Sequence, residues 1–331
     1  MRLKSISIII PNYNGTDLLK KNLPFVYEAL NTSNVKDFEI IISDDNSTDD
    51  SIFFIKENYK DIILLESKEN LGFSGNINKG IRAASKELVF LLNSDVELTP
   101  NYFEPLLNYF DHKDTFGVMG KIVSIDNKKL QDYAKYPKIK YCKIKSTRNY
   151  RFENESENES YYTFFLSGAN ALIDRKKLIE LDCFNELFSP FYYEDVELSF
   201  KAWRLGYKCY FEKKSICKHP YSVTIQKTAK KKKIKFITRK NRIILHYLHL
   251  NGISLAFYFI SLLIFSIFKL LVLDFMEINA IFIFLKNFKE IYNSKKNLSN
   301  LMKMKNSKFT LYDIKNFILN SLDNRNIEIF K

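Results

Sequence analysis

The stretch ISIIIPNYNG, residues 6–15, sets the pattern of the chain, because a run dominated by isoleucine passes directly into a polar turn. Such a β-branched run predicts a strand that is buried on both faces, as in a parallel sheet. The same pattern returns in FEIIIS at 38–43 and in ELVFLLNSD at 87–95. Helical patterns separate these strands, and this rhythm predicts a parallel sheet with right-handed crossovers. The first 120 residues therefore predict an α/β fold.

Helices are expected at 16–30, at 51–59 and, behind a glycine-bearing turn, at 70–85. Pro24 lies inside the first of them and predicts a kink or a break there. A further helix is expected at 194–205, where Val, Phe and Trp recur at a spacing that puts them on one face.

The composition excludes several classes of protein. With 331 residues, of which 46% are apolar, the chain is long enough for one or two domains and is not disordered. Its four cysteines include no CxxC pair, which excludes a disulfide scaffold and argues against a structural zinc site. The thiols expected to stay free are Cys142, Cys183, Cys209 and Cys217. The apolar run that ends at Pro11 is too short for a signal peptide, so we expect a cytoplasmic body.

The net charge of +13 is concentrated in the last third of the chain. Residues 227–331 hold 20 basic and 6 acidic side chains, and nine of the basic ones lie in 227–242. An apolar run, 253–273, contains only one charged residue and would measure roughly 31 Å as a helix, about the thickness of a bilayer core. A second apolar run follows at 278–285. A nucleic-acid domain would interleave aromatic and basic residues, so the segregated pattern favours an anionic membrane surface and no nucleic acid.

Three arrangements at a membrane remain open for the run 253–285. A single span would place one basic flank outside, against the positive-inside tendency. A re-entrant hairpin would bury Asp274 and Glu277 at an expensive depth. Helices that lie in the interface avoid both problems, and we favour an interfacial or shallow re-entrant arrangement. An ordinary buried core helix is the remaining alternative.

Polar residues follow three of the predicted strands at the point where each strand ends: PNYNG at 11–15, SDDNS at 43–47 and NSD at 93–95. Ligands of open parallel sheets bind beyond the carboxyl ends of the strands, so these segments are expected to meet at one cleft. Each alone is also typical of a turn or a helix cap, but three at neighbouring strand ends indicate a binding site.

Taken together, the motifs resemble those of the family 2 inverting glycosyltransferases, in particular the rhamnosyltransferase-like branch. The resemblance covers about residues 4–225 and rests on PNYNG, DDNSTDDS, NLGFSGNINKG, LLNSDVEL, SGANALI and YYEDVELSFKAWRLGYK in that order. It implies the GT-A fold of nucleotide-diphospho-sugar transferases, a mostly parallel sheet flanked by helices, over residues 1–225. Residues 226–331 would then form a basic and apolar helical region that associates with the membrane.

The resemblance also implies which residues bind a nucleotide-sugar donor. Asp45 would contact the base, and Pro11, Asn12 and Tyr13 would line the nucleotide pocket. The full predicted donor set is Pro11, Asn12, Tyr13, Asn14, Asp44, Asp45, Gly72, Asn78, Asn93, Ser94 and Asp95.

A divalent metal, Mg²⁺ or Mn²⁺, is implied as well, since it would stabilise the charge that develops on a diphosphate leaving group. Asp95, at the end of a buried strand, is the candidate ligand. Asn93 and Ser94 stand where the family often has a further carboxylate, which suggests a modest metal affinity. His219 lies where relatives often carry a histidine near the metal, and its role as a ligand or as a structural residue stays open.

The expected catalytic residues are Glu194 and Asp195, which match the base motif of the family at the start of a helix. An inverting transfer needs one carboxylate opposite the leaving group, and we assign the role of general base to Asp195. The alternative is that both acids only favour the helix dipole.

The predicted activity is the transfer of a single sugar, rhamnose-like or another hexose, to a hydroxyl of a lipid-linked or cell-surface glycan at the cytoplasmic face of the membrane. A processive polysaccharide synthase is one alternative, although its typical QxxRW motif is absent from the sequence. A catalytically inert, membrane-bound scaffold and a basic nucleic-acid-binding protein are the others.

Overall fold

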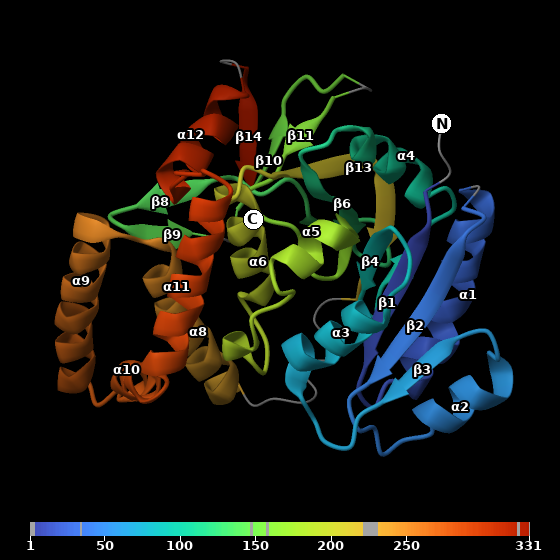
Figure 1. Cartoon of the computed structure of the whole chain (residues 1–331), viewed down its shortest axis with the longest axis horizontal. Helices are drawn as coiled ribbons and strands as arrows, with labels where there is room; N and C mark the ends of the chain where they lie inside the picture. Colours follow the sequence, from blue (N-terminus) through green and yellow to red (C-terminus); the bar gives the residue numbers. More distant parts are fainter. Residues whose placement is uncertain are drawn as a thin grey trace.

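The computed structural model describes residues 4–33, 35–145, 148–156, 159–220, 231–322 and 325–330. A ten-stranded sheet, whose main order is β11-β13-β6-β12-β4-β1-β2-β3, forms its centre (Figure 1). These strands are β1 Ile6–Asn12, β2 Phe38–Asp44, β3 Ile63–Glu66, β4 Leu88–Leu92, β6 Thr115–Val123, β11 Tyr161–Tyr162, β12 Asn170–Asp174 and β13 Lys208–Lys218. Two short strands, β5 Glu97–Leu98 and β7 Leu130–Asp132, pair with β13 and β6.

The sheet is parallel in its first half and mixed in its second. Strands β3, β2, β1 and β4 are parallel, as predicted. Strand β12 is antiparallel to both β4 and β6, so the prediction of a mostly parallel sheet is wrong for this half. Strand β12 starts opposite the end of β4, with Asn170 beside Leu92. The chain therefore enters β12 at the carboxyl end of β4 and runs through β12 in the opposite direction.

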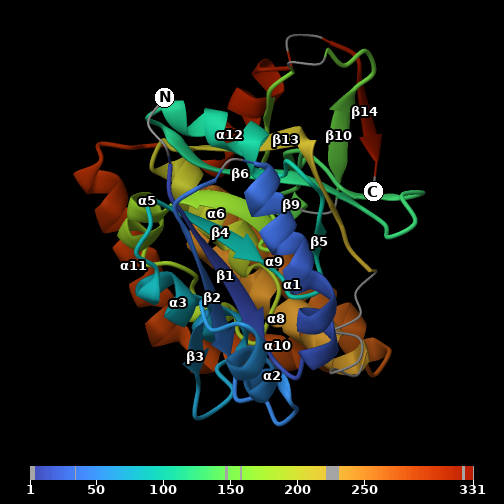
Figure 2. The same ribbon diagram turned by 90° about the vertical axis from the view of Figure 1, so that its right-hand side faces the viewer.

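Helices cover both faces of the sheet. They are α1 Thr16–Thr32, α2 Ser51–Asn58, α3 Gly72–Ala83, α4 Phe103–Leu107, α5 Arg175–Glu180 and α6 Glu194–Arg204, with short 3₁₀ turns η1 Asn108–Asp111 and η2 Glu186–Phe188. Figure 2 shows α1 and α3 on opposite sides of β1 and β2. Accordingly α1 packs in one hydrophobic core with Ile8 and Ile10, whereas α3 and α6 pack in a second core with Ile9 and Ile41.

Helix α1 continues through Pro24 to Thr32, so the predicted break is wrong. Pro24 and Lys20, whose carbonyl would have accepted the missing N–H, both lie on the exposed face of the helix. A carbonyl on that face can turn to solvent, and the helix therefore tolerates the proline.

The last third of the chain packs against the same core. It comprises α8 Lys231–His249, α9 Gly252–Leu271, α10 Met276–Lys286, α11 Phe288–Met304, α12 Leu311–Asn320 and β14 Ile327–Phe330. Ile243 and Leu248 of α8 are buried in one cluster with Trp203 of α6. Strand β14 pairs with β10 Asn149–Phe152, and a separate hairpin joins β8 Lys138–Lys140 to β9 Lys143–Lys145. The predicted regions 1–225 and 226–331 thus share a core, and their division stays a prediction.

Helix α9, at the left edge of Figure 1, is long and apolar enough to cross a membrane by length and composition. Only 17% of its apolar window is buried. Its inward face carries Tyr258, Leu262 and Ser266, whereas its outer face exposes large side chains such as Phe257 and Leu263. This exposure does not fit the alternative of an ordinary core helix.

The two acidic residues after α9 are neutralised within the protein. Asp274 and the fully buried Glu277 form ion pairs with Arg239 and Arg242 of α8, at 3.1 to 3.3 Å. Arginines therefore accompany both carboxylates, and the arrangement of 253–285 at a membrane stays a prediction. Part of the predicted basic cluster, 227–230, lies outside the described residues.

Candidate active site

The carboxyl ends of β1 and β2 are tied together by a buried hydrogen-bond network. The Asn12 amide donates to the Asp44 carboxylate at 2.8 Å and to the Ser47 hydroxyl at 3.2 Å. The backbone N–H and the hydroxyl of Ser47 also donate to Asp44. Asp44 is fully buried, so its carboxylate serves to fix the two loops that follow these strands.

Asn14 and Tyr13 form the outer part of this edge. The Asn14 carbonyl oxygen accepts a hydrogen bond from the backbone N–H of Thr48 at 2.7 Å, and Asn14 adopts a left-handed conformation with φ 50°, which asparagine tolerates. Tyr13 is 41% exposed, so part of its ring is open to a ligand. Pro11 lies within β1, beside Ser43 of β2.

Asp45 binds the backbone of the turn that begins α3. Its two carboxylate oxygens accept hydrogen bonds from the backbone N–H groups of Leu71 at 2.7 Å and Gly72 at 3.1 Å. Burial raises the pKa of Asp45, and these two N–H groups oppose that rise. Gly72 has φ +73°, and a Cβ there would lie 3.2 Å from the Pro190 backbone, so glycine allows α3 to approach the loop before α6.

Asn78 lies deeper, between α3 and the second half of the chain. Its amide donates to the Phe184 carbonyl at 2.8 Å and to the Glu186 carboxylate at 3.0 Å, and its oxygen accepts the Phe184 N–H. A contact between Asn78 and a nucleotide sugar would have to compete with these three hydrogen bonds.

Beyond β4 the chain brings Asp95 and His219 together, with Asp95 Oδ1 3.3 Å from His219 Nε2. His219 Nδ1 lies 3.3 Å from Oε1 of Gln131, which orients the ring. Asn93 donates its N–H to the Ala169 carbonyl at 3.1 Å, and the Ser94 carbonyl accepts the Asn22 amide at 2.8 Å.

The Asp95–His219 pair fits the predicted divalent metal. Within the described ranges no group of three His, Cys, Asp or Glu side chains could hold an ion. A cation bound to a diphosphate needs few protein carboxylates, because the phosphates and water supply the remaining oxygen ligands. One carboxylate and one imidazole at this edge meet that requirement.

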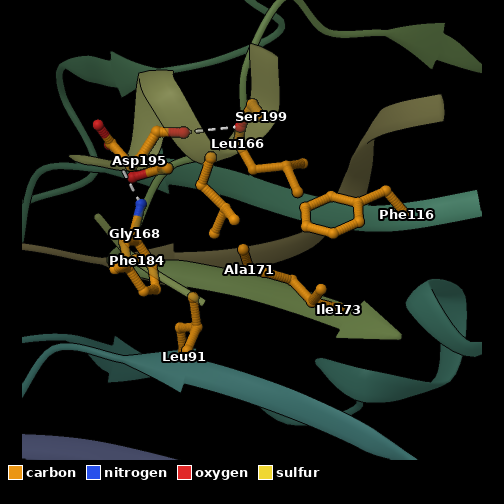
Figure 3. A pocket seen from close by; sticks show the side chains of 11 residues that line it. Leu91, Phe116, Leu166, Gly168, Ala171, Ile173, Phe184, Asp195 and Ser199 are labelled. Atoms are coloured by element: carbon orange, nitrogen blue, oxygen red, sulfur yellow. Dashed lines mark hydrogen bonds between the residues drawn. The ribbon is translucent and has the colours of Figure 1, made fainter. Parts of the chain in front are cut away.

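The candidate base lies at the start of α6. Asp195 accepts hydrogen bonds from the N–H of Val196 at 2.7 Å and of Gly168 at 3.3 Å. Its backbone carbonyl accepts the Ser199 hydroxyl at 2.8 Å. Figure 3 shows Asp195 beside a small hollow of about 10 Å³, lined mainly by apolar side chains that include Leu166.

Glu194 and Asp195 differ in their electrostatic surroundings. Burial and the neighbouring Asp195 carboxylate raise the pKa of Glu194 well above its usual range, and one Glu194 oxygen has no hydrogen-bond partner in the described residues. Burial raises the pKa of Asp195 as well, but the N–H groups of Val196 and Gly168 and the ammonium of Lys135 act in the opposite direction. Of the two carboxyl groups, Glu194 therefore holds a proton more readily than Asp195.

Two contacts join the donor edge to the base. Gly168 binds Asp195 while the next residue, Ala169, binds Asn93 at the end of β4. The N–H of Phe73, at the start of α3, donates to the Pro190 carbonyl at 3.0 Å. These contacts link the end of β4 and the start of α3 to the segments that hold the predicted base.

Sequence reasoning missed several supporting residues. Ser199 stands four residues after Asp195 on a helix, a spacing at which a serine hydroxyl bonds the earlier carbonyl, so it could have been found. Lys135 offers no such signal. Its ammonium pairs with Asp132 and bonds Asn149 Oδ1 at 3.1 Å, and burial lowers its pKa to about 8.

Residues 7–182 match the family described as glycosyl transferase family 2, and these residues span every strand end of the donor edge. The chain belongs to glycosyl transferase family 2. The predicted family is therefore confirmed, and the base motif at 194–195 lies just beyond the matched segment.

A curated relative of this family 2 member is the GalNAc(5)-diNAcBac-PP-undecaprenol beta-1,3-glucosyltransferase of Campylobacter jejuni. The two are 33% identical over 109 residues, 32% of this chain and 34% of the relative. The chain thus spans only about a third of that relative's length.

Two solved structures confirm the GT-A fold of this family 2 member. GalNAc-T7 with UDP, GalNAc and Mn²⁺ has a TM-score of 0.59 at 16% identity, over 76% of this chain and 49% of its own. The mannosyltransferase PcManGT from Pyrobaculum calidifontis, with GDP-Man and Mn²⁺, has a TM-score of 0.52 at 14% identity. That match covers 96% of this chain and 79% of the other, so it includes the helices after β13.

Proposed function

We propose that the protein is an inverting glycosyltransferase that moves one sugar from a nucleotide-diphospho-sugar to a hydroxyl of a glycan acceptor. The observation that carries this proposal is the link between the two halves of the site: Gly168 bonds Asp195 at the start of α6, and Ala169 bonds Asn93, two residues before Asp95. A donor site and a base on opposite sides of one cleft are what a single displacement requires.

In this proposal Asp195 takes the proton of the acceptor hydroxyl. The acceptor oxygen then bonds to the anomeric carbon as the bond to the diphosphate breaks. Glu194 stays protonated beside it and so leaves Asp195 as the only ionised carboxylate of the pair. Mainly apolar side chains line the hollow beside Asp195, and such a lining strengthens the electrostatic interaction of the carboxylate with the proton it receives.

On the donor side, Asp45, Tyr13 and Asn14 would hold the nucleoside. Asp95 and His219 would hold Mg²⁺ or Mn²⁺, which when bound neutralises charge on the diphosphate. The two structural neighbours were solved with UDP or GDP-Man and with Mn²⁺, which supports a nucleotide-sugar donor and a divalent metal here.

We also propose a lipid-linked or cell-surface glycan as the acceptor. The name of the Campylobacter relative, a glucosyltransferase named for a glycan on PP-undecaprenol, supports an acceptor of this class. The donor sugar would be rhamnose-like or another hexose, in keeping with the motifs of the rhamnosyltransferase-like branch.

The proposed location is the cytoplasmic face of the membrane, with residues 226–331 as the docking region. Its support is the exposed apolar face of α9 and α10 beside the basic start of α8. Each lysine or arginine near an anionic leaflet contributes about 1 kcal/mol, so several of them suffice for docking. An interfacial position of α9 fits its inward face, which stays packed on the protein.

A processive synthase is a weaker candidate, because the single tryptophan, Trp203, follows alanine and cannot belong to a QxxRW motif. An inert scaffold is weaker too, since both Asp95 and Asp195 are present in one site.

The proposal is tested with a panel of nucleotide sugars, by measuring the release of nucleoside diphosphate and the thermal shift with Mn²⁺ or Mg²⁺. We expect one donor to stabilise the protein and to be slowly hydrolysed, with both effects lost in EDTA. A chain that responds to no donor, at any metal concentration, would contradict the proposal.

A further inference from the structure

The loop 187–193, which leads directly into Glu194 and Asp195, is held by two side chains from the last third of the chain. Lys240 of α8 donates to the carbonyls of Leu187 at 3.1 Å and Ser189 at 2.8 Å. The neighbouring Asn241 amide donates to three more loop carbonyls, those of Phe188, Phe191 and Tyr192, at 2.6 to 2.9 Å. Five of the six carbonyls from 187 to 192 therefore bond to α8.

The two side chains that hold the loop differ in their exposure to solvent. Asn241 is completely buried. Lys240 is partly buried and forms no ion pair within the described part of the chain, so the loop carbonyls are what satisfy its ammonium. A buried ammonium without a carboxylate is costly, and its desolvation is compensated only while the loop stays in place.

The loop itself needs to be held. Tyr192 and Tyr193 both adopt the left-handed conformation, with φ 76° and 75°, which costs free energy for large side chains. Tyr193 is the residue that directly precedes α6, so this conformation sets where the helix and its first carboxylates begin. On its other side, the loop carbonyl of Pro190 binds the N–H of Phe73 at the donor edge.

Helix α8 is anchored from its opposite face. Around a helix that turns 100° per residue, the mean direction of residues 240 and 241 lies about 180° from the mean direction of residues 239 and 242. Arg239 and Arg242 bond Asp274 and Glu277 of the α9–α10 turn, so α8 is fixed between that turn and the loop.

We propose that Lys240 and Asn241 are positioning residues, which fix the loop 187–193 so that Asp195 faces the donor. This proposal rests on the proposed function for its catalytic consequence, but the holding of the loop is a physical claim of its own. It gives the last third of the chain a role in catalysis besides docking.

The test compares Lys240→Met with Lys295→Met. Lys295 is a matched control, because its half-buried ammonium also donates to two carbonyls of this region, Tyr247 and Leu250, both at 2.7 Å, but not to the loop. Burial lowers the pKa of both lysines to about 8. Lys240→Arg restores the N–H donors. Asn241→Ala removes the hydrogen bonds from the second residue to the loop.

The first readout is amide hydrogen exchange of peptides that cover 187–195, which needs no substrate. We expect Lys240→Met and Asn241→Ala to speed exchange there about tenfold, with Lys295→Met unchanged in these peptides. The second readout is hydrolysis of the nucleotide sugar that the wild type accepts. We expect kcat to fall about 10- to 100-fold in Lys240→Met with the donor KM changed less than about threefold, and Lys240→Arg to recover most of it.

The outcomes separate the two proposals. If exchange in 187–195 and kcat are the same in Lys240→Met, Lys295→Met and the wild type, the positioning role is overturned. If Lys240→Met merely lowers the thermal midpoint and both lysine variants lose kcat equally, it is overturned as well. If the wild type hydrolyses no nucleotide sugar, the proposed function fails, and the exchange result alone decides whether Lys240 and Asn241 hold the loop.

Discussion

The donor side and the base side of this site are built by different kinds of contact. On the donor side, the partners that hold the loops after β1 and β2 come from successive parts of the chain: Asn12 and Asp44 are 32 residues apart, and Asp45 and Leu71 are 26 apart. On the base side, Lys240 binds a carbonyl 53 residues earlier in the chain. The donor side thus follows from the βαβ rhythm, whereas the base side depends on how the last third of the chain folds back.

The two sides also differ in how they treat their adjacent acids. Asp44 and Asp45 accept hydrogen bonds from N–H and O–H groups of the loops around them. Glu194 is buried with one oxygen unpartnered among the described groups, a setting that favours a proton. In the proposed function, the similar sequence pairs DD and ED would therefore serve donor binding in one place and proton transfer in the other.

The largest effect is expected for Asp195→Asn. Removing a general base typically costs 10²- to 10⁴-fold in rate, so kcat for donor hydrolysis should fall by about that factor while donor affinity stays within about threefold. The measurement is nucleoside diphosphate release beside a binding titration. Asp182→Asn, at a side chain that is 95% exposed, is the control. Turnover within a few-fold of the wild type would remove Asp195 from its role.

Next in size is Glu277→Gln, which tests how strongly α8 is anchored by its ion pairs with the start of α10. The buried carboxylate pairs with Arg239 and Arg242, so its loss should lower the free energy of unfolding by about 3 kcal/mol. Urea unfolding measures this, with the exposed Glu290→Gln as the control. Equal midpoints for the two variants would show that the α8 anchor contributes little.

For the donor side, Asp95→Asn should weaken metal-dependent binding of a nucleoside diphosphate at least tenfold, because the pair with His219 loses its charge. Isothermal titration with and without Mn²⁺ measures it. Asp111→Asn removes a surface carboxylate that pairs with Lys4 and serves as the control. An unchanged dependence on Mn²⁺ would place the metal elsewhere.

The smallest effect is a pH dependence in α8. Burial lowers the pKa of His246 to about 3, and its Nε2 accepts the N–H of Ile144 at 2.9 Å. The unfolded chain binds a proton below about pH 6.5 that the folded chain does not bind, so stability is lost as the pH falls. Between pH 7 and 5 this costs about 2 kcal/mol. Urea unfolding at pH 7 and at pH 5 measures this loss. The free energy of unfolding should fall less between the two pH values in His246→Gln than in the wild type, and equal losses would contradict the assignment.

Much of the donor side could be predicted from the sequence. The strands β1, β2 and β4 and their polar ends lie where the isoleucine- and leucine-rich runs placed them. The pairing of Asp95 with His219 was foreseen only through the family resemblance, since 124 residues of chain separate them and no local pattern links them.

The base side could be predicted only in part. Helix α6 and its first acids follow from local signals. The hydrogen bonds from Asn241 to the loop do not, because a single asparagine in a basic helix has no distinguishing pattern. The long strands β6 and β13 were missed, and β13 pairs with β6 through register shifts that interrupt a regular pattern. Long-range packing decided these features.

The most direct test of the central claim is the stereochemistry of the sugar first released from the donor that the panel identifies. Time-resolved proton NMR follows the anomeric signal before mutarotation. A single displacement with Asp195 as the base predicts that the released sugar has the opposite anomeric configuration to the donor. Release with retained configuration would contradict the account, because it would require a covalent or front-face route that this pair of sites does not provide.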